Sequence, residues 1–298
     1  HSYLGGDGGD VVVAGDTIYF VEYNGNRVTA WSDVAAIAPA ADALRRAPDF
    51  ALFDDDPDVS TLLRDGIIQN PVPLIVGDML VVTSDYDAQV HVWREAPATP
   101  GSRADVVQQL GFQPWDSATH DGALLLAGQT TLLVWDDYEP GQDPTRIYSD
   151  HIGTVAIEEL RGVGWDGTHL AISETRSGTI HVFEGLPDDG DAPVRSISMS
   201  QPGRLDLVDG QLVVAPYGAA GIRLADLSGD AVLRELPVRT NLPMQARILP
   251  LGFVIVDTGF HRVLVFADVD AALAGRDPLV EIGAGVERPS ATADGLFL

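Results

Sequence analysis

The chain has 298 residues and a formal charge of −26, because 44 acidic residues outnumber 18 basic ones, all of which are arginine. The absence of lysine excludes a P-loop lysine and Schiff-base catalysis, and the absence of cysteine excludes disulfides, thiol nucleophiles and thiolate-bound metals. So negative a chain repels phosphate backbones, which argues against nucleic acid as a partner. No apolar run reaches the ~18 residues that a membrane-spanning helix needs, so we expect no membrane span.

A turn containing glycine, followed directly by an apolar strand, recurs along the chain. The glycines of these turns are Gly15, Gly77, Gly122, Gly167, Gly210, Gly252 and Gly295, at steps of 62, 45, 45, 43, 42 and 43 residues. Gly-Asp and Asp-Gly pairs between apolar runs are typical of hairpins, because glycine adopts positive φ without steric cost. A period near 43 residues with short strands is typical of the blades of a β-propeller.

Each period continues with a second strand that ends in a bulky ring. The rings are Trp31, Trp93, Trp135, Phe183 and Phe266, and the fifth period is degenerate at 222–226. A turn with Gly, Asp or Pro then leads to a fourth strand. We therefore expect an all-β fold, a β-propeller of four-stranded blades with six complete repeats plus a partial seventh, and we expect the rings to be buried between blades.

The whole chain, 1–298, is predicted to form this single domain. The long first step contains an Ala-rich insertion at about 32–47, which predicts a short helix capped at Ser32-Asp33. A second helical turn is expected at 268–274, ended by Gly275.

The seventh turn, Asp294-Gly295, is followed only by the strand-like Leu296–Leu298. Either the ring has seven blades with a composite last blade, or it has six blades and a tail. We expect the polypeptide to continue beyond Leu298, or this strand to pair with the N-terminal segment near Tyr3-Leu4.

The stretch Asp257-Thr258-Gly259-Phe260-His261-Arg262-Val263-Leu264-Val265-Phe266 resembles the core of an NHL repeat, whose usual wording is D-T-G-N-x-R-V-L-V-F. Segments 22–28 and 85–93 are weaker copies, and 101–107 and 275–282 are similar to the final strand of that repeat. The resemblance covers nearly the whole chain in its period.

The resemblance, together with the lack of catalytic motifs, implies a non-enzymatic binding or scaffolding propeller. We expect it to be exported, extracellular or periplasmic, and to contact a protein or a saccharide through its rim loops. The alternative is a metal-dependent hydrolase or lyase, similar to the propeller lactonases and amidating lyases, which place one metal at the channel mouth.

Acidic residues recur where the second strand of a blade ends, at Glu22, Asp85, Glu174 and Asp257. They can cap turns and pair with nearby arginines, or they can ring the rim where propeller ligands bind. His151 is expected on the same rim, and His120 and His169 on the other. Trp115 and Trp165 fall outside the phase of the repeat and are candidates for lining a surface.

One segment has the spacing of a calcium loop. Asp54, Asp56, Asp58 and Asp65 occupy positions one, three, five and twelve of an EF-hand-like stretch, although Val59 stands where that loop has its glycine. Calcium is the one cation that the sequence suggests, and the alternative is a plain acidic loop.

Overall fold

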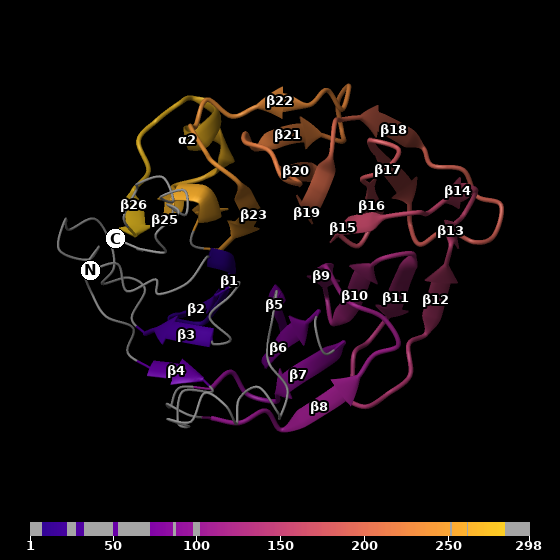
Figure 1. Ribbon diagram of the computed structural model, residues 1–298, viewed down its shortest axis with the longest axis horizontal. Coiled ribbons are helices and arrows are strands. Elements are labelled where there is room, and N and C mark those ends of the chain that lie inside the picture. Colours follow the sequence, from indigo (N-terminus) through magenta and orange to yellow (C-terminus); the bar gives the residue numbers. More distant parts are fainter. Residues whose placement is uncertain are drawn as a thin grey trace, which may run out of the picture.

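The computed structural model describes residues 8–22, 28–32, 50–52, 72–85, 88–97, 102–250, 252–260 and 262–283. These residues form six four-stranded antiparallel sheets, arranged as the blades of a six-bladed β-propeller (Figure 1). The prediction of an all-β propeller with six complete repeats is confirmed.

Each blade consists of four strands that follow one another in the chain. The first has β1 (Gly8–Ala14), β2 (Thr17–Glu22), β3 (Val28–Trp31) and β4 (Phe50–Leu52). The second has β5 (Val72–Val76), β6 (Met79–Ser84), β7 (Gln89–Trp93) and β8 (Val106–Gln109). The third has β9 (Asp116–His120), β10 (Ala123–Gly128), β11 (Thr131–Trp135) and β12 (Arg146–Ser149).

The remaining blades repeat this order. The fourth has β15 (Leu160–Trp165), β16 (His169–Glu174), β17 (Thr179–Glu184) and β18 (Arg195–Ser198). The fifth has β19 (Pro202–Val208), β20 (Gln211–Pro216), β21 (Arg223–Asp226) and β22 (Arg234–Glu235). The sixth has β23 (Pro243–Leu249), β24 (Gly252–Asp257), β25 (Arg262–Phe266) and β26 (Val280–Gly283).

Two short features lie between these strands. A hairpin of β13 (His151–Ile152) and β14 (Val155–Ala156) connects the third blade to the fourth. A 3₁₀ turn, η3 (Thr258–Phe260), follows β24, and α2 (Val269–Leu273) follows β25. Asp268 caps α2 by accepting a hydrogen bond of 2.6 Å from the Ala271 amide, so the second predicted helical turn is confirmed.

The first strand of each blade lies innermost, and the fourth lies at the periphery (Figure 1). All six described Gly turns connect a first strand to a second strand, so they lie on one face of the ring, which we call the turn face. Each turn glycine has positive φ, from 55° at Gly15 to 134° at Gly252, as predicted. Asp121 and Asp209 also have positive φ before their glycines, which is the geometry of a type I′ hairpin.

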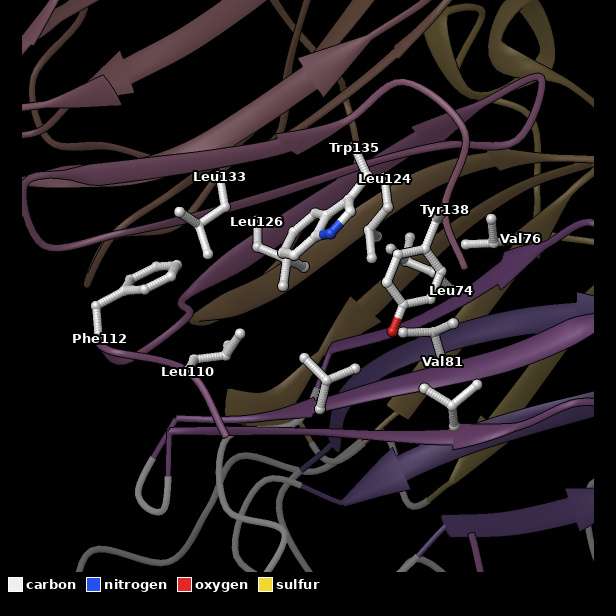
Figure 2. Close-up of a cluster of buried hydrophobic side chains, with 12 residues drawn as sticks. Leu74, Val76, Val81, Leu110, Phe112, Leu124, Leu126, Leu133, Trp135 and Tyr138 are labelled. Atoms are coloured by element: carbon white, nitrogen blue, oxygen red, sulfur yellow. The ribbon is translucent and has the colours of Figure 1, made fainter. Parts of the chain in front are cut away.

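Six buried hydrophobic clusters hold the blades together, one at each interface between neighbours. Trp31, Trp93, Trp135, Phe183 and Phe266 each belong to a different cluster and are at most 6% exposed. Figure 2 shows the cluster between the second and third blades, where Trp135 and Tyr138 face Leu74, Val76 and Val81. The prediction that the repeated rings pack between blades is confirmed.

The fifth blade has Ala225 at the position of the ring. Ala225 pairs with Leu212, as Trp135 pairs with Leu124 in the third blade. Around Ala225 the interface with the fourth blade is filled by smaller side chains, including Leu205, Leu207 and Leu227. The degenerate fifth repeat therefore keeps its fold by replacing one large side chain with several aliphatic ones.

The sixth cluster joins the last blade to the first. It combines Val11, Phe20 and Trp31 with Val254 and Val263, so the first sheet packs directly on the sixth. The ring consequently closes with six blades. The helix predicted at about 32–47 lies outside the described residues, except for Ser32. The partial seventh repeat at 290–298 and the segment near Tyr3 also lie outside them.

Close contact between the inner strands requires glycine in the fourth blade. A Cβ on Gly162 would lie 2.3 Å from the Gly203 carbonyl oxygen, and a Cβ on Gly164 would lie 2.8 Å from the Leu207 Cβ. These glycines let β15 approach β19 closely near the centre of the ring.

Replacement of Trp135 by alanine is expected to lower the free energy of unfolding by about 3–5 kcal/mol, because it leaves a cavity in a fully buried cluster. Urea denaturation followed by circular dichroism measures the change. Val107→Ala, at an exposed residue of β8, is the control and should stay within about 0.5 kcal/mol of wild type. Equal losses in the two variants would contradict the assignment of the ring to the core.

Candidate functional site

A cluster of charged side chains lies buried among the inner strands. Arg247 of β23 binds Asp10 of β1 through two bonds, Nε to Oδ1 at 2.9 Å and Nη2 to Oδ2 at 2.6 Å. Its Nη1 lies 3.6 Å from Oδ1 of Asp206 on β19. Arg204, also on β19, donates to the Gly9 carbonyl oxygen at 3.4 Å. Burial opposes the charge of Arg247, but the carboxylates of Asp10, Asp206 and Asp116 outweigh it and raise its pKa.

Asp116, the first residue of β9, connects four blades. Its Oδ2 accepts hydrogen bonds of 3.0 Å from the amides of Val163 and Leu205, and its Oδ1 lies 3.4 Å from Nε2 of Gln245. Burial raises the pKa of Asp116 to about 7, against the opposing influence of Arg204 and Arg247. Burial likewise raises the pKa of Asp206 to about 6, although Arg247 and the Ile248 amide favour its carboxylate.

A cavity of about 280 Å³ lies above this cluster, at the ends of the six inner strands on the turn face. We call it the central cavity. Its walls are mainly apolar, and its polar side chains are those of Thr119, Asp206 and Arg247. The other lining residues are Val12, Val13, Pro73, Leu74, Ile75, Ala118, Trp165, Leu207, Val208, Ile248, Leu249 and Pro250.

A second cavity, of about 360 Å³, opens between the third and fourth blades on the same face. We call it the inter-blade groove. It is lined by His120, Asp121, Ala123, Leu125, Val134, Asp136, Trp165, Asp166, Gly167, Thr168 and Leu186. The side chains of Asp121 and Asp136 are exposed, that of His120 is 40% exposed, and that of Trp165 packs on the hydrophobic cluster between the two blades.

The turn after β15 shapes one wall of the groove. Asp166 accepts hydrogen bonds from the amides of Thr168 and His169, at 2.9 and 2.7 Å, and from the Gly210 amide of the fifth blade at 2.9 Å. These bonds outweigh burial and lower the pKa of Asp166. Gly167 has φ of +85°, a conformation that favours glycine, and a Cβ there would lie 2.7 Å from the His120 ring.

Two of the predicted rim acids, Glu174 and Asp257, hold turns on the face opposite the turn face. Glu174, 2% exposed, accepts a hydrogen bond of 2.7 Å from the Glu159 amide and a second from the Ser177 amide. Asp257, fully buried, accepts one of 2.8 Å from Asn241 and pairs with Arg262 at 3.2 Å. Burial is the main cause that raises the pKa of Asp257, whereas hydrogen bonds lower that of Glu174 in spite of burial. These contacts match the interpretation in which the acids cap turns, rather than the one in which they bind a ligand at the rim.

The other predicted positions are more varied. Asp85 directly follows β6, and Glu22 is the last residue of β2, so both recur at the predicted place. His151 is exposed in the β13–β14 hairpin and is not part of either cavity. The predicted calcium ligands Asp54, Asp56, Asp58 and Asp65 lie outside the described residues.

The two tryptophans outside the repeat phase are both partly buried. Trp165 contributes to both cavities. On the opposite face, the Arg161 guanidinium lies 4.0 Å from the ring centroids of Trp115 and of Tyr217, and Glu159 holds it with a 2.7 Å ion pair. His120 and His169 both lie on the turn face, as expected. The sequence pattern did not identify Asp121 and Asp136 as candidate site residues, because the repeat alone does not indicate which turn residues face a neighbouring blade.

No protein-family model matches the chain, and neither does any curated protein. Among the described residues, no group of three or more histidines and acids is arranged to hold a metal ion. Within the same residues, no helix is long and apolar enough to cross a membrane.

Replacement of Arg247 by methionine is expected to lower the free energy of unfolding by about 3–5 kcal/mol, because it leaves Asp10 buried without its ion-pair partner. The double variant Asp10→Leu/Arg247→Met, which removes both charges, should be more stable than Arg247→Met alone. Urea denaturation at pH 7 compares the two. A double variant less stable than the single one would show that the pair does not act as a unit.

Stability should also depend on the protonation of Asp116. The folded carboxyl keeps its proton to about pH 7, whereas an unfolded one loses it near ~3.9. Its contribution to stability is therefore present in acid and is lost as the pH rises through about 7. Asp116→Asn mimics the protonated form, so its free energy of unfolding should not fall with pH in this way. The difference in free energy of unfolding between the variant and wild type should therefore be about 2–3 kcal/mol larger at pH 8 than at pH 5. A difference from wild type that is the same at both pH values would contradict the raised pKa.

Proposed function

We propose that this propeller is a non-enzymatic binding protein that recognises a saccharide in the inter-blade groove. The groove itself carries the proposal, because the indole ring of Trp165, the exposed carboxylates of Asp121 and Asp136 and the imidazole of His120 all line it. Carboxylates accept hydrogen bonds from sugar hydroxyls, and an aromatic face packs against the C–H face of a sugar ring.

The size and charge of the groove narrow the class of ligand. A cavity of about 360 Å³ suits a small molecule, whereas a stable protein partner buries about 800 Å² on each side. With a chain charge of −26 and carboxylates in the groove, acidic sugars are repelled. The proposed ligand is therefore a neutral or amino sugar. We also propose that the protein lies outside the cell or in the periplasm, and that it is related to the NHL propellers.

Isothermal titration calorimetry with glucose, galactose, glucosamine and glucuronic acid tests the proposal. At least one of the first three should bind saturably, and glucuronic acid should not. Asp136→Ala should weaken binding about tenfold, because a hydrogen bond to a charged group is lost.

Asp143→Ala, at an exposed acid of the same blade outside both cavities, is the matched control and should bind like wild type. Failure of all three sugars to bind, or equal weakening by the two variants, would overturn the proposal. Release of a cleaved product from a glycoside would instead favour the hydrolase alternative.

A further inference from the structure

The inter-blade groove and the central cavity are neighbours on the turn face. Trp165 lines both of them. The end of β9 is likewise shared, because Ala118 and Thr119 line the central cavity while His120 and Asp121 line the groove. A groove with charged side chains and a mainly apolar cavity therefore share the indole ring of Trp165.

The central cavity suits an apolar group. Val13, Ile75, Val208 and Leu249 are partly exposed side chains of its wall, contributed by four different blades. The charged groups that reach it already have partners. Asp206 accepts a hydrogen bond of 2.7 Å from the Ile248 amide and lies beside Arg247, whose other bonds go to Asp10. An apolar occupant can thus cover the cavity without leaving a charge unpaired.

We propose that one ligand occupies both cavities: a glycoside whose sugar lies in the inter-blade groove and whose compact apolar aglycone enters the central cavity past Trp165. The proposal rests on the saccharide function and adds the class of the attached group. An aromatic ring fits, since an apolar cavity of about 150 Å³ accommodates benzene and the central cavity measures about 280 Å³.

Calorimetry with matched pairs of methyl and phenyl β-glycosides tests the proposal, using glucose, galactose and glucosamine as the sugar. The phenyl glycoside should bind about tenfold more tightly than the methyl glycoside of the same sugar, because its ring leaves water.

Two variants test whether the higher affinity for the phenyl glycoside comes from the central cavity. Val208→Phe and Leu249→Phe each fill the central cavity, from the fifth and the sixth blade, and each should abolish the preference for phenyl while leaving methyl glycoside binding unchanged. Val107→Phe, on the outer strand β8, should retain the preference. Circular dichroism and thermal melting establish that each variant is folded.

The outcomes separate this inference from the function on which it rests. Equal affinity for methyl and phenyl glycosides, or a phenyl preference that persists in both folded filling variants, would overturn the two-cavity ligand and leave the saccharide site standing. Failure of every glycoside to bind wild-type protein would overturn both.

Discussion

The buried ion pair between Arg247 and Asp10 joins the last blade to the first, across 237 residues of chain. Each described sheet is built from consecutive strands, so no strand is shared between the first and sixth sheets. Closure of the ring among these residues depends on this pair and on the hydrophobic cluster around Trp31 and Val254. Without closure, the facing surfaces of these two sheets would be open to water. The rest of the ring therefore depends on this contact.

The charges around that pair balance when Asp116 is protonated. The cluster then contains the carboxylates of Asp10 and Asp206 and the guanidinium groups of Arg204 and Arg247. Burial is the main cause that raises the pKa of Asp116 to about 7, and the opposing influence of Arg204 and Arg247 does not overcome it. Asp206 and Arg247 of this cluster also line the central cavity. A ligand that enters from the turn face therefore meets paired charges below and apolar walls around it.

The acidic residues of this chain have two different uses. Asp166, Glu174 and Asp257 accept hydrogen bonds from backbone amides and hold turns in place. Asp121 and Asp136 are exposed in the groove that Trp165 also lines. Glu174 and Asp257 recur at the ends of second strands, whereas Asp166 follows a first strand. The groove acids follow from the way two particular blades meet, so they carry the candidate site.

The sequence by itself determined the repeat and its local chemistry. The glycine turns, the strands that follow them and the rings from Trp31 to Phe266 are set by residues close together in the chain, and those within the described residues are found where predicted. The tertiary structure alone decided the closure at six blades, the filling around Ala225 and the cavities beside Trp165. The reason is physical: Asp116 meets Gln245 across 129 residues, and local patterns do not encode which blade faces which.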